Sequence, residues 1–116
     1  MTRAIYLIFG ALAVLAGVAA LAMPSLILAE NTTPLTSHLV REEAAAFVFI
    51  GLMFFWCLRH FAARGPVHFA LLLFTVLFAG IHWFDYLGSR RSLVSPLVNT
   101  LPALLLAVTA PRATDR

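Results

Sequence analysis

Five side chains in this sequence have the types that bind protons, metal ions or small polar ligands: Glu43, His82, Asp85, Asn99 and His38. His82 and Asp85 are three residues apart, a spacing that places two side chains on one face of a helix. Histidine changes its charge near neutral pH, and imidazole and carboxylate groups together are ligands of zinc and iron. This group therefore predicts a proton- or ligand-binding site, with His38 as a further ligand if the site holds a metal ion.

A structural interpretation of the same residues, as contacts between helices, is favoured at this point. In this interpretation Asp85 pairs with Arg90 or Arg91, and His82 pairs with Glu43 or Asn99. An ionisable side chain at the middle of a bilayer costs about 2.5–3.5 kcal/mol, so such a residue has either a partner or a role. The spacing of two residues on one helix does not distinguish a contact between helices from a binding site.

The elements that must position these residues are predicted to be membrane helices. Of the 116 residues, 62% are hydrophobic and 11% are charged, and the mean hydropathy is +0.96. Soluble domains contain about 45–50% apolar and about 25% charged residues, and small ones bury only roughly two-thirds of the surface of their chain. The composition therefore excludes a soluble domain, a disordered chain and a nucleic-acid-binding protein, and it predicts the lipid bilayer as a partner.

A spanning helix needs about 20 apolar residues, and the chain supplies four such segments in a single domain, 1–116. We expect helices over residues 4–23 or 4–29, 43–61, 66–87 and 92–110. The first is expected to be retained, because its apolar stretch exceeds the roughly 7–15 residues of a signal-peptide core. Short connections make successive helices antiparallel neighbours, which predicts an all-α four-helix up-down bundle.

The distribution of arginine predicts the orientation of this bundle. Five Arg residues fall on the side of the two termini and three on the other side, which also holds Glu30, Glu42 and Glu43. Because positively charged loops stay in the cytoplasm, we expect both termini to be cytoplasmic in a multi-pass protein of the inner membrane. On this topology the five candidate side chains all lie in the outer leaflet.

The first helix carries a stripe of small residues: Gly10, Ala13, Ala16, Gly17 and Ala20. Small residues four positions apart let two helix backbones approach closely in lipid. The stripe therefore predicts tight packing, either against another helix of this chain or against another protein. Most phenylalanines fall in the second and third segments, where they form a core, a lipid-facing coat or the wall of a hydrophobic ligand pocket.

The fourth segment contains two prolines with different expected effects. Ser95 and Pro96 have the types that start a helix, as N-cap and first-turn proline. Pro102 falls inside the helix, where it leaves the carbonyl of Val98 without its usual donor and predicts a kink. Membrane helices tolerate such kinks, but a short, proline-interrupted segment beside a polar residue such as Asn99 also occurs where a binding site lines a cavity.

Together these patterns favour a non-catalytic accessory or interaction subunit that packs against a larger membrane complex or against itself. The small-residue stripe would supply the contact. The alternative is a proton- or small-ligand-binding carrier or sensor that uses the outer-leaflet group, and a second alternative is a redox protein that depends on a metal ion or a quinone. The favoured case involves no catalytic residue and no cofactor, and the pattern of residues identifies no particular metal ion.

Overall fold

The computed structural model describes residues 1–24, 33–89 and 92–111, and the regular structure in these ranges is helical, without strands. The four α-helices are α1 (Thr2–Ala22), α2 (Pro34–Arg59), α3 (Gly65–Ser89) and α4 (Val94–Val108). A short 3₁₀ turn, η2 (Phe61–Ala63), connects α2 to α3. The prediction of an all-α fold is confirmed for the described part of the chain, and the expected extension of the first helix to residue 29 falls outside it.

Two helices begin at residues other than the expected ones. α2 begins at Pro34 rather than near residue 43, because the Thr33 hydroxyl accepts a hydrogen bond from the Thr36 amide at 3.2 Å and caps the helix. α4 begins at Val94, with Leu93 at the N-cap position and no side-chain cap. The expected N-cap role of Ser95 is therefore wrong, since Ser95 lies within the helix and its hydroxyl contacts His82 instead. Pro102 lies inside α4, as expected.

Glycines bring α1 and α2 into backbone contact. A Cβ atom built on Gly17 would lie 2.7 Å from the carbonyl oxygen of Ala44, and one built on Gly51 would lie 2.8 Å from that of Gly10. Distances this short leave no room for any side chain at these positions, which is the packing that small residues permit between helices in lipid. The stripe of α1 therefore contacts α2 of the same chain through Gly10 and Gly17.

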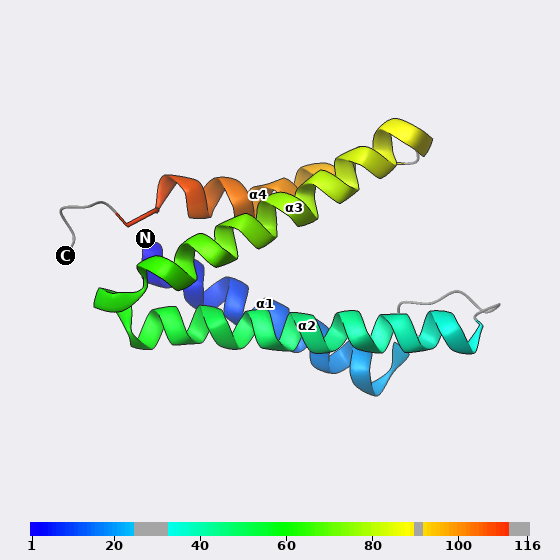
Figure 1. The fold of residues 1–116 in the computed structure, drawn as a ribbon, viewed down its shortest axis with the longest axis horizontal. Coiled ribbons are helices and arrows are strands. Elements are labelled where there is room, and N and C mark those ends of the chain that lie inside the picture. Colours follow the sequence, from blue (N-terminus) through cyan, green and yellow to red (C-terminus); the bar gives the residue numbers. More distant parts are fainter. Residues whose placement is uncertain (25–32, 90–91, 112–116) are drawn as a thin grey trace.

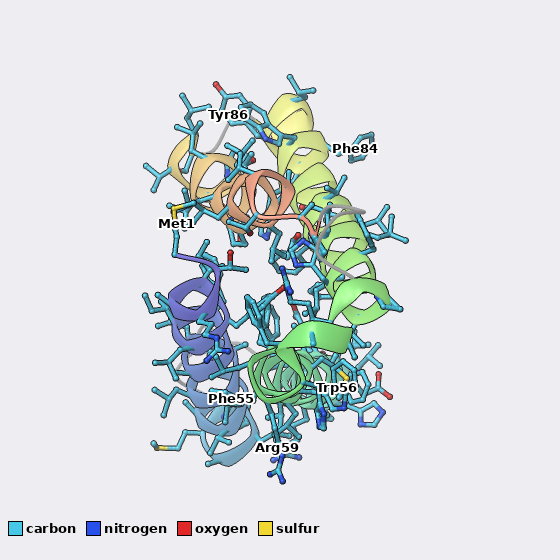
Figure 2. All side chains as sticks on the ribbon, turned by 90° about the vertical axis from the view of Figure 1, so that its left-hand side faces the viewer. Met1, Phe55, Trp56, Arg59, Phe84 and Tyr86 are labelled. Carbon is cyan, nitrogen blue, oxygen red and sulfur yellow. The ribbon has the colours of Figure 1, made fainter. Side chains whose placement is uncertain are left out.

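The helices form two pairs, α1 with α2 and α3 with α4, which Figure 1 shows side by side. The pairs meet at the end of the molecule that holds the N-terminus and the last turn of α4, and they diverge towards the other end (Figure 1). In the view along the long axis, α1 and α2 form one layer and α3 and α4 the other (Figure 2). We call the end where the pairs meet the closed end and the opposite end the open end.

The best buried apolar cluster lies at the closed end and joins all four helices. Its members are Ile5 and Tyr6 of α1, Phe54 and Cys57 of α2, Leu71 of α3 and Leu106 of α4. In contrast, large apolar side chains cover the outer surfaces, and Phe84 of α3 projects away from α4 with 78% of its surface exposed (Figure 2). The core thus holds the pairs together at one end and leaves much apolar surface uncovered.

Candidate functional site

At the closed end, one histidine joins three helices. The Tyr6 hydroxyl of α1 lies 2.5 Å from Nδ1 of His68 on α3, and Nε2 of His68 lies 3.0 Å from the carbonyl oxygen of Leu106 on α4. A carbonyl oxygen only accepts, so Nε2 carries the hydrogen and the Tyr6 hydroxyl donates to Nδ1. Tyr6, His68 and Leu106 have 0% exposure, and both ring nitrogens have a partner.

The end of α4 explains why a backbone carbonyl is available to His68. The last turn of a helix leaves carbonyl groups without an intrahelical donor. Near the end of α4 the Leu106 carbonyl accepts from the Thr109 amide at 3.2 Å and has further capacity for the imidazole of His68. The contact therefore completes a helix end, and we interpret it as a structural connection between the two pairs.

Two arginine side chains lie against an aromatic ring beside this connection. The guanidinium carbon of Arg64 lies 3.8 Å from the centre of the Phe61 ring, and that of Arg3 lies 4.8 Å from it. Arg64 also donates from Nη1 to the Phe61 carbonyl oxygen at 2.6 Å. These contacts fix η2 against the start of α1 and bury Arg64, whose aliphatic stem packs while its charge faces the ring.

The open end of the α3–α4 pair holds a cavity of about 480 Å³, which we call the polar cavity. Its lining residues are His82, Phe84, Asp85, Tyr86, Gly88, Ser92, Ser95 and Pro96. Nδ1 of His82 lies 3.0 Å from the Ser95 hydroxyl, and Asn99 donates from its amide nitrogen to the Ser95 carbonyl oxygen at 2.9 Å. The polar cavity therefore holds two of the five candidate residues, His82 and Asp85, and Asn99 lies one turn from it, bonded to the Ser95 carbonyl.

The other two candidates, Glu43 and His38, lie on α2. Both are exposed, and His38 forms an ion pair with Glu42 at 3.2 Å, one turn along the same helix. The start of α2 is at the open end of the other pair, well separated from the end of α3 (Figure 1). The expected partner of His82 was Glu43 or Asn99, and the structure gives Ser95 instead. Arg90 and Arg91, the expected partners of Asp85, lie outside the described residues.

A second hollow of about 420 Å³, which we call the apolar cleft, opens between the two pairs. Five aromatic rings line it: Phe9, Phe47, Phe54, Phe74 and Phe78. Ala13 and Ala16 of the α1 stripe also line it, as do Val98, Asn99 and Pro102 of α4. The stripe therefore has two uses, since its glycines contact α2 and these two alanines border the cleft. Of the phenylalanines of the second and third segments, Phe47, Phe74 and Phe78 line the cleft, and Phe54 both lines it and belongs to the core.

The apolar cleft and the polar cavity are neighbours along the same two helices. Phe78 of the cleft and His82 of the cavity are one turn apart on α3, with their ring centres 4.9 Å apart. Asn99 of the cleft and Ser95 of the cavity are likewise one turn apart on α4 and hydrogen-bonded. An apolar surface thus passes into a polar one within about 5.4 Å, the rise of one helical turn.

The contacts described at these sites are hydrogen bonds and apolar contacts. Within residues 1–24, 33–89 and 92–111, no group of three or more His, Cys, Asp or Glu side chains has the arrangement of a metal site. Comparisons with protein-family models, with curated proteins and with solved structures found no match for this chain. The geometry of the two hollows is therefore the basis for assigning a function.

Proposed function

We propose that this chain is a small multi-pass protein of the cytoplasmic membrane, whose four helices pass up and down through the bilayer with both termini inside. α1 and residues 65–88 of α3 are long and apolar enough to cross a membrane, and α4 is apolar but shorter. Large apolar side chains such as Leu15 and Val108 are more than 65% exposed. Water-soluble proteins rarely expose contiguous apolar surface on this scale, whereas lipid solvates it without cost.

The distribution of charge supports the same orientation. Arg3 and Arg59 are exposed at the closed end, and Arg59 points away from the other helices (Figure 2). The exposed acidic residues Glu42 and Glu43 lie at the open end of the α1–α2 pair. Because arginine is retained on the cytoplasmic side, the closed end faces the cytoplasm and the polar cavity faces outwards.

Membrane integration and orientation have a direct test. Alkaline carbonate extraction should leave the protein in the membrane pellet, and a fluorescent protein fused to the C-terminus should fluoresce, as it does only in the cytoplasm. Alkaline phosphatase fused after residue 89 should be active, since that position is on the outer side. Release of the protein into the carbonate supernatant would contradict the membrane assignment, and the opposite reporter pattern would reverse the orientation.

In this membrane the protein binds a small ligand without transforming it, as a carrier or sensor. The single observation that supports this role best is that the polar cavity and the apolar cleft lie one helical turn apart on α3 and α4, because a few polar groups beside an apolar hollow are typical of ligand sites. His82, Asp85 and Asn99 belong to the site, with Ser95 added to the predicted set. Glu43 and His38 are not part of it.

Ligand binding can be tested by filling the cleft. Ala13 is half-buried at the cleft wall, and Ala19 is exposed on the same helix and does not line it, so Ala13→Trp and Ala19→Trp form a matched pair. Wild type and both variants are purified from the same membranes, and the small molecules that accompany each protein are identified by mass spectrometry. We expect one species to accompany wild type and Ala19→Trp and to be lost from Ala13→Trp. The same profile in all three would contradict the role.

A role as an accessory subunit is the second candidate. Its support is a row of exposed side chains along α3, Leu73, Leu77, Ile81 and Phe84, which offers a continuous apolar face to another membrane helix. The glycines of the α1 stripe are already in contact with α2, so this face replaces the stripe as the predicted contact. A photo-reactive residue at Leu77 should then form an adduct of one defined protein mass in native membranes, and adducts with bulk lipid alone would contradict it.

A further inference from the structure

We propose that the ligand is an uncharged aromatic compound that carries a hydroxyl group and lies in the apolar cleft. This inference rests on the proposed ligand-binding function, and it adds the chemical class of the ligand and its place among the four helices. Three features of the cleft carry it: its size and lack of charge, the aromatic rings contributed by both helix pairs, and the oxygen atoms of its two polar side chains.

The size and lining of the cleft restrict its occupant to a small uncharged molecule. Its volume of about 420 Å³ is in the range of roughly 300–1,000 Å³ that small-molecule sites have. An α-helix with side chains is about 10–12 Å wide and rises about 5.4 Å per turn, so this volume holds only one turn of a partner helix. Among the described residues, those that line the cleft include no charged side chain. A charged ligand would therefore be buried without an opposite charge, which is strongly unfavourable.

The aromatic rings of the lining come from both helix pairs. The ring centres of Phe9 on α1 and Phe54 on α2 are 6.0 Å apart. On α3 the rings of Phe74 and Phe78 are nearly parallel, with their centres 5.8 Å apart. Phe47 of α2 meets Phe78 edge to face at 5.5 Å, so ring contacts cross from one pair to the other. Aromatic groups attract each other at centre distances of about 4.5–7 Å. An aromatic ligand extends this set of contacts, whereas a saturated one offers only its apolar area.

The two polar side chains of the lining, Thr75 and Asn99, favour a ligand that donates a hydrogen bond. Thr75 is 7% exposed, and its hydroxyl donates to the Leu72 carbonyl oxygen at 2.9 Å. Because a hydroxyl has one hydrogen, the Thr75 oxygen then only accepts from a ligand. Asn99 donates one N–H to the Ser95 carbonyl oxygen and keeps its own carbonyl oxygen and a second N–H. A ligand hydroxyl can serve both residue types, whereas an ether oxygen cannot donate to either.

The test measures how four related molecules stabilise the full chain in vesicles of phosphatidylcholine. They are 2-naphthol, 2-decalol (a hydroxyl on saturated rings), 2-methoxynaphthalene (aromatic rings without a donor) and the charged 2-naphthoate. A molecule that binds the folded state raises the unfolding temperature. The readout is the temperature at which the fully buried Cys57 becomes reactive to a fluorescent maleimide. At equal content per lipid, we expect 2-naphthol to raise it most, and each of the others to need about tenfold more for the same rise, the loss expected when one favourable contact is removed.

Variants of the cleft wall locate the binding. Ala13→Trp fills the cleft and should lose the response to 2-naphthol, whereas Ala19→Trp, outside the cleft, should keep it. Val98→Trp fills the cleft from α4, with the exposed Val108→Trp as its control, and it provides the same test if Ala13→Trp does not fold. The unfolding temperature of each variant without ligand shows whether it folds.

Thr75→Val tests the hydroxyl contact without filling the cleft. Its response to 2-naphthol should fall to the response that wild type shows to 2-methoxynaphthalene. Thr109→Val is the matched control and should respond as wild type. Thr109 is also 7% exposed and donates to a carbonyl oxygen of its own helix, that of Leu105, but it does not line the cleft.

Different results would overturn different parts of the inference. Equal responses of wild type to 2-naphthol and 2-decalol would overturn the aromatic class. Equal responses to 2-naphthol and 2-methoxynaphthalene, or an unchanged response of Thr75→Val, would overturn the hydroxyl contact. An equal response to 2-naphthoate would overturn the requirement for an uncharged ligand, and an undiminished response of both filling variants would overturn the cleft as the site.

The outcome also separates this inference from the function on which it rests. If filling the cleft removes a molecule that accompanies the purified protein, but 2-naphthol does not stabilise wild type, the protein binds a ligand of another class and this inference is wrong. If neither the accompanying molecule nor the response to 2-naphthol depends on the filling variants, the ligand-binding function itself is wrong.

Discussion

His68 and His82 lie fourteen residues apart on α3, close to four helical turns, and therefore on nearly the same face of that helix. Each contacts a hydroxyl group of another helix, Tyr6 for His68 and Ser95 for His82. Their surroundings differ greatly, because three helices converge on His68, whereas the hydrogen bond of His82 joins α3 to α4 alone. His68 is fully buried with both ring nitrogens bonded, whereas His82 is half-buried at the edge of a cavity.

Under the proposed function, one residue type serves structure at one end and binding at the other. A buried polar group must have its partners within the protein, since leaving one unpaired costs about 1–3 kcal/mol. A group at the boundary of a cavity exchanges hydrogen bonds with water or ligand instead. Because the helix pairs diverge, the histidine at the closed end connects helices, whereas the histidine at the open end borders a cavity.

We expect the largest loss of stability when α1 is separated from α2, because the packing of the molecule depends on that pair along its length. Gly51→Leu places a side chain where a Cβ alone would lie 2.6 Å from Val14 and 2.8 Å from the Gly10 carbonyl oxygen. Overpacking costs about 1–3 kcal/mol and more where backbone must move, so we expect loss of the folded state. The measurement is the temperature at which the single cysteine, Cys57, becomes reactive to a fluorescent maleimide in mild detergent.

Gly80→Leu is the matched control for that substitution. Gly80 also lies in a helix, but a Cβ there has nothing within 4 Å. We expect Gly80→Leu to keep or raise the unfolding temperature, because glycine in a helix costs up to about 1 kcal/mol relative to other residues. Equal losses for the two variants would show that close contact between α1 and α2 is not what the glycine provides.

The second prediction compares the two histidines directly. His68→Ala removes the acceptor of the Tyr6 hydroxyl and a donor to the Leu106 carbonyl and opens a cavity, so we expect a loss of about 2–4 kcal/mol. His82→Ala removes a half-exposed side chain with one hydrogen bond, and we expect less than about 1 kcal/mol. Cys57 reactivity during chemical unfolding measures both values. If His82→Ala were as costly as His68→Ala, the open end would be as structural as the closed one.

Composition and local pattern were sufficient to predict some features of this molecule. An all-α fold follows from long apolar segments, and the small residues of the first helix indicated close packing, which Gly10 and Gly17 provide. The closed-end connection could not be predicted in the same way, because Tyr6 and His68 are 62 residues apart and the third member is a backbone carbonyl. A backbone acceptor has no signature in the sequence, and its availability depends on where α4 ends.

The positions of the candidate residues were predicted in part for a related reason. The order of segments predicts that Glu43 and His82 lie on the same side of a membrane, but it does not fix the lateral distance between two helix pairs that diverge. His82, Asp85 and Asn99 lie on the two helices of one pair, where a spacing argument holds. Ser95 was assigned to a cap, because a serine before a proline is a typical helix start and its contact with His82 depends on the register between α3 and α4.

A smaller effect is expected from Tyr6→Phe, which tests the closed end without creating a cavity. The variant keeps the ring that packs at 6.2 Å from Phe54 and removes only the donor to Nδ1 of His68. We expect a loss of about 1–2 kcal/mol, because a buried acceptor is left unpaired. Tyr86→Phe, at the edge of the polar cavity, is the control and should change the unfolding midpoint little. A neutral Tyr6→Phe would mean that ring packing alone, and not the hydrogen bond, connects the pairs.

Ser95→Ala is expected to have the smallest effect on stability. It distinguishes the roles of the closed end and the open end most clearly. Removal of this hydroxyl leaves Nδ1 of His82 at a cavity open to its surroundings, so we expect a change of less than about 0.5 kcal/mol, as for other exposed positions. Ligand binding should respond differently, since the hydroxyl that contacts the imidazole at the edge of the cavity is gone, and the small molecule that accompanies the purified wild-type protein should be recovered in several-fold lower amount. A variant that loses stability to the extent of Tyr6→Phe while its bound molecule is unchanged would give the two ends the same structural role. Loss of the bound molecule with unchanged stability requires that the polarity of the open end acts on a ligand and not on the fold.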